Sequence, residues 1–211
     1  MTQRDNSKPK GPAICVYCGA SSGSDPVFLA SARSLGADMA KAGVDLVYGA
    51  GGIGLMGEVA RAVLAGGGHV TGVIPDFLKA REVHLKEIQE VIVTKDMHER
   101  KMLMFERADA FVALPGGIGT LEELIEQLTW AQLGQHRKPV VIANVAGFWD
   151  PLLALLAHMH TTGFLNKPFM PGAAEARYHV VPRIEDVIPQ TLALLRAGAS
   201  AAADGDITHR F

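Results

Sequence analysis

The segment ALPGGIGTLEE (113–123) combines residues suited to anion binding with residues suited to acid–base chemistry. Gly116, Gly117 and Gly119 let the backbone turn sharply, and the exposed N–H groups at the start of a following helix attract anions. Thr120 adds a hydroxyl donor. No Lys-Ser/Thr pair follows the glycines as a Walker loop requires, so ATP hydrolysis is disfavoured. The segment predicts a binding loop for one small anion, such as a monophosphate.

Two acids, Glu122 and Glu123, end this segment. Acids in the first turn of a helix interact favourably with the helix dipole, by about 0.3–1 kcal/mol, and Thr120 with Glu123 also fits a Thr-x-x-Glu capping box. Alternatively, one carboxylate does chemistry beside the bound phosphate. Because successive helical residues point about 100° apart, at most one of the two faces the site. The residues leave capping and catalysis open for Glu123, and Glu122 is expected to be an ordinary first-turn acid.

A second candidate cluster, MHERK (97–101), lies upstream and supplies Arg100 and Lys101. In a helix Met97, Arg100, Lys101 and Met104 share one face, because they follow i, i+3, i+4 and i+7 spacing. Both cations could simply extend to solvent over an apolar stem. The functional alternative is that Arg100 reaches the mouth of the glycine loop.

A second glycine turn, YGAGGIGLMG (48–57), contains Gly49, Gly51 and Gly54 in a G-x-G-x-x-G-like pattern. The dinucleotide fingerprint belongs to the first strand–helix unit and is followed about 20 residues later by an acid. Here the turn follows the second predicted strand, and residues 68–71 contain no acid. NAD or FAD binding is therefore disfavoured; close packing of a helix start, or contact with another ligand, explains the glycines as well.

Cys15 and Cys18 form a C-x-x-C pair inside an apolar, β-like run. Residues three apart on a strand point to opposite faces of the sheet. One pair also provides too few ligands for a closed zinc site. A structural role is favoured over redox or metal chemistry, and no metal site is expected.

Apolar runs alternate with amphipathic stretches along the chain, which predicts right-handed β-α-β units and a parallel α/β sheet. Ligands of such sheets bind beyond the carboxyl ends of the strands. The glycine-rich or polar clusters that follow the first five strands are all expected at that edge, in one site. The expected strands are 13–19, 44–52, 69–75, 87–96, 110–115 and 139–145, with 178–182 as a short strand or extended segment; the expected helices are 26–42, 56–65, 97–107, 119–133, 149–162 and 184–198.

The composition indicates one globular domain: 211 residues, 48% hydrophobic and 20% charged, with a formal charge of −2. We expect a single domain over 13–198 between a flexible N-terminal segment (1–12) and a flexible tail (199–211). The near-neutral charge gives no support for nucleic-acid binding, and no apolar run reaches the roughly 18 residues of a membrane span. The polar start MTQRDNSKPKGP lacks the apolar middle of a signal peptide, so a cytoplasmic protein is expected.

PGGIGTLEE (115–123) with MHERK upstream resembles the LONELY GUY family of cytokinin riboside 5′-monophosphate phosphoribohydrolases, which often carry the label lysine decarboxylase. The resemblance covers about 13–196 and includes VYCGASSGSDP, LVYGAGGIGLMG, GVIPDFL and ELIEQLTWAQLGQHRKPVVIANVAGFWDPLL. It implies a Rossmann-like, doubly wound sheet, a homodimer, no cofactor, and hydrolysis of a nucleoside 5′-monophosphate to free base and ribose 5-phosphate.

The resemblance also implies roles for individual residues. Arg100 and Glu123 would be the catalytic pair, and the loop from Gly116 to Thr120 would hold the phosphate. The other implied substrate contacts or near neighbours are Ser22, Gly51, Gly52, Glu82, Lys101, Ile118 and Thr129.

Two functions of other classes stay open beside hydrolysis: a carrier of a phosphorylated cofactor, and a structural or interaction protein with a degenerate site, against which the intact pair of Arg100 and Glu123 argues. Related folds with the same glycine loop carry the molybdenum cofactor, a phosphorylated pterin, and a carrier of that kind would not need Glu123. Lysine decarboxylation is disfavoured, because pyridoxal chemistry needs a Schiff-base lysine and the glycine clusters offer none.

Overall fold

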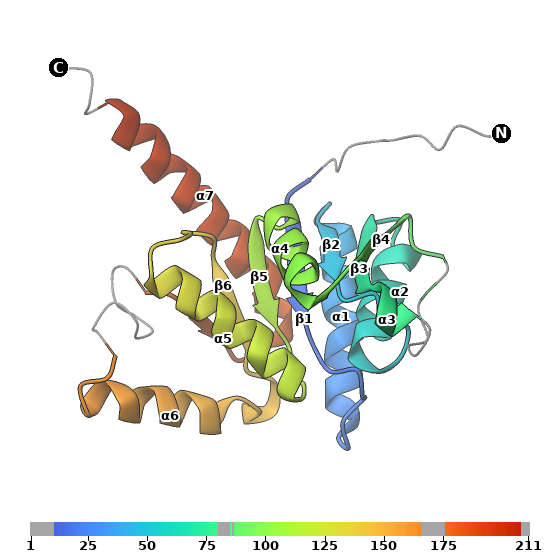
Figure 1. The fold of residues 1–211 in the computed structure, drawn as a ribbon, viewed down its shortest axis with the longest axis horizontal. Helices are drawn as coiled ribbons and strands as arrows, with labels where there is room; N and C mark the ends of the chain where they lie inside the picture. Colours follow the sequence, from blue (N-terminus) through green and yellow to red (C-terminus); the bar gives the residue numbers. More distant parts are fainter. Residues whose placement is uncertain (1–10, 80–84, 86, 166–175, 208–211) are drawn as a thin grey trace.

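The computed structural model describes residues 11–79, 85, 87–165 and 176–207, the last seven of these by their backbone alone. Seven parallel strands form one sheet in the order β4-β3-β2-β1-β5-β6-β7. The expected parallel α/β fold is confirmed (Figure 1). The strands are β1 (Ala13–Tyr17), β2 (Asp45–Tyr48), β3 (Val70–Pro75), β4 (Glu90–Thr94), β5 (Ala110–Ala113), β6 (Val140–Ala143) and β7 (His179–Val181).

Helices cover both faces of the sheet, which makes the fold doubly wound. Alternate side chains of β1 enter different cores: Ile14 and Val16 pack with α1, α2 and α7, whereas Cys15 and Tyr17 pack with α4, α5 and α6. The helices are α1 (Pro26–Lys41), α2 (Gly54–Ala65), α3 (Asp76–Lys79), α4 (Met97–Arg107), α5 (Ile118–Gln132), α6 (Asp150–Thr161) and α7 (Val187–Ile207), with 3-10 turns η1 (Val145–Gly147) and η3 (Ile184–Asp186).

The order of the strands reverses at β1: β2 to β4 are added on one side of it, and β5 to β7 on the other. Tyr17 at the end of β1 pairs with Ala113 at the end of β5. Just beyond, the Gly19 N–H donates to the Pro115 carbonyl over 3.1 Å, so the loops after these two strands lie against each other. A switch point of this kind is the usual ligand site of an open parallel sheet.

Side-chain caps begin the two helices whose starts were predicted most closely. Asp25 accepts a hydrogen bond from the Val27 N–H at the start of α1, over 2.9 Å. Asp96 accepts one from the Glu99 N–H at the start of α4, also over 2.9 Å. Both are the local signal that a helix start normally carries.

The last helix is the clearest boundary error. It was expected to end at residue 198 with an unstructured tail beyond, but α7 continues to Ile207. The sequence ASAAAD after Gly198 contains four alanines, the best helix former, and this outweighs the glycine at 198. The short helix α3 was also not expected.

The two cysteines are free, buried and on opposite sides of the sheet, since Cys15 and Cys18 belong to different cores. Their structural interpretation is therefore supported. Among the described residues, no helix is long and apolar enough to cross a membrane.

Candidate active site

A cavity of about 420 Å³ opens at the switch point. The loops after β1 and β5, the helices α1, α2, α4 and α5, and the segment after β6 contribute its lining. Its lining residues are Cys18, Gly19, Ala20, Ser21, Ser22, Gly23, Phe28, Leu55, Met56, Arg100, Pro115, Gly116, Gly117, Gly119, Thr120, Glu123 and Phe148.

The start of α5, where the sequence predicts anion binding, lies at this cavity. Gly117 is the N-cap and makes no side-chain cap, so the first N–H groups of the helix have no capping partner. Gly116 allows the close approach of this turn: a Cβ there would overlap the Thr120 side chain and lie 2.8 Å from the Gly19 nitrogen. The loop therefore has open backbone donors where a phosphate would bind.

The same start of α5 decides the capping question. Because the N-cap is Gly117, Thr120 lies at the third position of the helix and Glu123 lies beyond the first turn. Thr120 and Glu123 consequently form no capping box, and the helix has no acid in its first turn. The expectation that Glu122 is a first-turn acid is wrong for the same reason.

The second glycine turn, at the start of α2, is closed. The N–H groups of Leu55 and Met56 both donate to the Gly19 carbonyl, over 3.0 and 3.3 Å. Gly54 has a φ of +60°, and a Cβ there would overlap the backbone of Ala20. Close packing therefore accounts for Gly54, and the second and third N–H groups of this helix are already bound by the protein.

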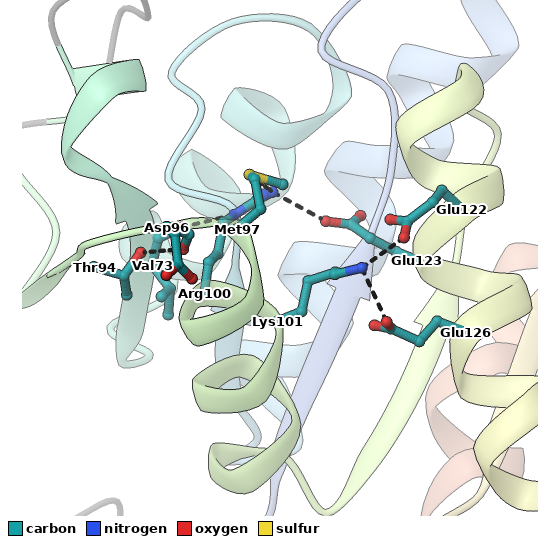
Figure 2. Close-up of polar contacts among 9 residues, drawn as sticks. All are labelled: Val73, Thr94, Asp96, Met97, Arg100, Lys101, Glu122, Glu123 and Glu126. Atoms are coloured by element: carbon teal, nitrogen blue, oxygen red, sulfur yellow. Dashed lines mark hydrogen bonds and ion pairs between the residues drawn. The ribbon is translucent and has the colours of Figure 1, made fainter.

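Arg100 and Glu123 meet across the gap between α4 and α5 (Figure 2). The Nη1 atom of Arg100 lies 3.3 Å from Oε1 of Glu123, and the two side chains are only 12% and 11% exposed. The Nε of Arg100 donates to the Val73 carbonyl over 3.2 Å, and Nη1 also lies 3.9 Å from the Met97 sulfur. The guanidinium is thus held at two of its three nitrogens.

Burial raises the pKa of the Glu123 carboxyl from 4.5 to about 7. The positive charges of Arg100 and Lys101 oppose this increase, whereas Glu122 and Glu126 add to it. A carboxyl with a pKa near neutrality that lies in a cavity beside a cation is a candidate catalytic group.

Lys101, the residue after Arg100, is directed to a different part of α5. Its ammonium pairs with Glu122 over 2.6 Å and with Glu126 over 2.9 Å, and its side chain is 14% exposed (Figure 2). Burial alone lowers the pKa of Lys101, but the two ion pairs outweigh it and the pKa is raised. The solvent-facing interpretation of Arg100 and Lys101 is therefore wrong.

The structure brings most of the expected site residues to one cavity: Ser22, Arg100, Gly116, Gly117, Gly119, Thr120 and Glu123. Other expected contacts do not line this cavity: Gly51, Gly52, Lys101, Ile118 and Thr129. The Thr129 hydroxyl donates to the Ile125 carbonyl within α5, over 2.7 Å, and Ile118 is 83% exposed. Glu82 lies outside the described residues.

Two aromatic residues of the cavity were missed. Phe28 of α1 and Phe148 after η1 pack edge to face with ring centroids 5.7 Å apart, both at the cavity wall. Phe148 follows the sixth strand, so the rule that was applied to the clusters after the first five strands would have found it.

Comparisons with known proteins show which families and proteins this chain is similar to. The family model described as "Possible lysine decarboxylase" matches residues 56–190. Cytokinin riboside 5′-monophosphate phosphoribohydrolase LOG7 of Arabidopsis thaliana is 49% identical, over 77% of this chain and 75% of its own length. The chain belongs to the LONELY GUY family. The phosphoribohydrolase LOG of Oryza sativa subsp. japonica, another LONELY GUY protein, is 48% identical over 84% of this chain and 74% of its own length.

Solved structures with the same fold include the molybdenum cofactor carrier protein of Chlamydomonas reinhardtii, with a TM-score of 0.65 over 89% of this chain and 99% of that one. Its sequence identity is 22%, which supports a common fold alone. The sequence identity of the two LONELY GUY relatives, 49% and 48%, is about twice that of this carrier protein.

Proposed function

We propose that this protein is a phosphoribohydrolase that cleaves the N-glycosidic bond of adenosine 5′-monophosphates, including those with an N6 substituent. Water and the nucleotide give the free base and ribose 5-phosphate. The observation that supports this most is the Arg100–Glu123 pair, which lines the same cavity as the open start of α5. Family membership supports the same reaction, because the similar LONELY GUY proteins carry that activity in their names.

The phosphate positions the substrate in this proposal. Its anion would accept hydrogen bonds from the N–H groups at the start of α5 and from Thr120, where the helix dipole also favours negative charge. Glu123 lies less than one full turn of helix beyond Thr120. Binding energy from the non-reacting phosphate would therefore fix the anomeric carbon near the carboxylate.

Glu123 would act in its ionised form. As the bond from ribose to base lengthens, the sugar becomes oxocarbenium-like and positive, and an adjacent carboxylate stabilises that charge. The same carboxylate can orient water and take its proton as the new C–O bond forms. A pKa near 7 suits a group that must be ionised yet accept a proton near neutral pH.

Arg100 would serve both Glu123 and the substrate. Its Nη1 holds the carboxylate and its Nε is bound to the Val73 carbonyl, so Nη2 is the nitrogen without a hydrogen-bond partner among the described residues. The charged guanidinium, which lines the cavity, would also stabilise charge on the departing base. A charged donor of this kind is typically worth about 10² to 10³ in rate.

The alternatives receive less support. A carrier of a phosphorylated cofactor would use the open start of α5 but has no need of a buried carboxylate with a raised pKa, and the carrier proteins resemble this chain at 20–22% identity only. Lysine decarboxylation needs a Schiff-base lysine. No lysine is found among the described residues that line the cavity.

The decisive experiment is to incubate the purified protein with AMP and with N6-isopentenyl-AMP and to assay free base and ribose 5-phosphate. We expect equimolar release of both products. Tight binding of either nucleotide without product release over prolonged incubation would favour the carrier alternative and exclude hydrolysis.

A cytoplasmic homodimer completes the proposal. The resemblance to the LONELY GUY family implies the dimer; Ile118 at the start of α5 and Leu133 just beyond its end are apolar side chains that are 83% and 68% exposed. Light scattering on the purified protein tests the dimer, and a mass of one chain would contradict it.

A further inference from the structure

Gly49, the residue after β2, lies against the guanidinium group of Arg100. A Cβ added at Gly49 would overlap Nη2 of Arg100 and lie 3.4 Å from its Cζ. Gly49 is buried and has no positive φ that would require glycine. The space beside its Cα, and not its backbone conformation, is therefore what this position provides.

We propose that Gly49 is a positioning residue that holds the Arg100 guanidinium against Glu123. This inference rests on the proposed function for its effect on rate. Three contacts then define the arginine: the Val73 carbonyl at Nε, the Glu123 carboxylate at Nη1 and the flat, side-chain-free surface of Gly49 at Nη2. Each comes from a different element, so the three together fix both the position and the tilt of the plane.

A methyl group at residue 49 should disturb the position of the Arg100 side chain while leaving the fold intact. The atom it would displace is the end of a long side chain, which can swing away without moving the backbone. The third atom near the added Cβ is the Met56 sulfur at 3.4 Å, an ordinary contact distance. Gly49→Ala should therefore fold, but its Arg100 can no longer keep the Val73 and Glu123 contacts together.

Glu123 reports on this displacement. The charged groups that act on its carboxyl are Arg100 and Lys101 from α4 and Glu122 and Glu126 from α5, and the neutral Cys15, Tyr17 and Cys18 of β1 and its following loop lie close to it. Arg100 is the largest influence that lowers the pKa. Moving its guanidinium away raises the pKa of Glu123 further, so a larger share of the enzyme is protonated and inactive at pH 7.

The experiment compares Gly49→Ala with wild type and with Gly68→Ala, a glycine before β3 that does not line the cavity and where a Cβ would lie 2.7 Å from the side chain of Val63. We expect Gly49→Ala to lose about 10²-fold in kcat/KM with AMP, as a displacement of about 1 Å at a reacting centre can cause. The acidic limb of its pH profile should move to higher pH. Gly68→Ala should keep the wild-type profile, whatever its thermal stability.

Two further measurements need no catalytic activity. In a ¹³C NMR titration, the Glu123 carboxyl should titrate at higher pH in Gly49→Ala than in wild type. Arg100→Lys keeps the charge but lacks Nη2, so adding Gly49→Ala to it should cost less stability and shift the Glu123 pKa less than adding it to wild type. Unchanged Glu123 titration, or additive effects in this cycle, would overturn the positioning role. Absence of hydrolysis in wild type would instead refute the proposed function and leave this test intact.

Discussion

Nη1 of Arg100 lies 3.3 Å from Oε1 of Glu123, at a point where both side chains are almost fully buried yet line a cavity. The desolvation free energy of a buried ion pair can exceed the stability that the pair contributes. A functional role for this pair is therefore favoured over a purely structural one. Its two members come from helices that flank the sheet's switch point, and the start of α5, where we propose that the phosphate binds, lies beside it. This arrangement leads to the following predictions.

Replacing Glu123 by glutamine should reduce hydrolysis of AMP by about 10² to 10⁴, because the amide can neither stabilise the positive sugar nor accept a proton from water. The size and position of the side chain are nearly unchanged. Steady-state release of ribose 5-phosphate measures the effect.

Glu122→Gln is the matched control for that variant. Glu122 is the adjacent acid on the same helix, but it is 52% exposed and pairs with Lys101 outside the cavity. It should retain activity close to that of wild type. An equal loss in both variants would show that general damage to α5, and not the Glu123 carboxylate, explains the result.

The rate should depend on pH through Glu123. Its pKa is raised to about 7, and the proposed active form carries the negative charge. As pH rises from 5 to 8, kcat/KM with AMP should therefore increase and level off above the pKa. A profile that is flat over this range, or one that falls, would contradict an ionised Glu123 as the catalytic form.

Gly117→Ala should weaken nucleotide binding without damaging the fold. A Cβ at Gly117 meets no atom within 4 Å, so the methyl fits the protein, but it lies at the start of α5 where the phosphate is expected. We expect an approximately tenfold higher KM for AMP and an unchanged melting temperature.

Gly198→Ala is the control, since its Cβ also meets nothing within 4 Å but lies on α7, away from the cavity. It should leave KM unaltered.

Adenosine, which has no phosphate, should be a poor substrate for wild type. Equal turnover of adenosine and AMP would refute the role given to the loop.

Lys101→Met should affect stability more than catalysis. The ammonium joins α4 to Glu122 and Glu126 of α5, and its removal leaves Glu126, at 20% side-chain exposure, without this cation. We expect a loss of about 1 kcal/mol in the free energy of unfolding, measured by urea denaturation. A large increase in KM at unchanged stability would restore Lys101 as a substrate contact in the assembled protein.

Local signals in the sequence predicted the fold well. The parallel sheet follows from the alternation of apolar and amphipathic segments, and α1 and α4 begin at the predicted residues 26 and 97, where the structure shows the short-range caps Asp25 and Asp96. The end of α7 differs from the expected residue 198, because the alanines after Gly198 continue the helix to Ile207.

The site needed information that no local pattern contains. Whether Thr120 or Gly117 caps α5 depends on how the turn packs against Gly19, which comes from a different strand–helix unit. Lys101 could not be assigned for a similar reason: its partner Glu122 is 21 residues away on another helix. The residue types of the site can be read from the sequence, but which of these residues contact one another depends on the tertiary structure.

At the start of α2 the N–H groups of Leu55 and Met56 bind the Gly19 carbonyl, which leaves the start of α5 as the proposed anion anchor at this cavity. Under the proposed reaction, only one of the two products keeps the group that this anchor grips. The base should diffuse out first and ribose 5-phosphate last. Ribose 5-phosphate should then compete with the incoming nucleotide, so accumulated sugar phosphate would slow turnover while accumulated base would do so far less.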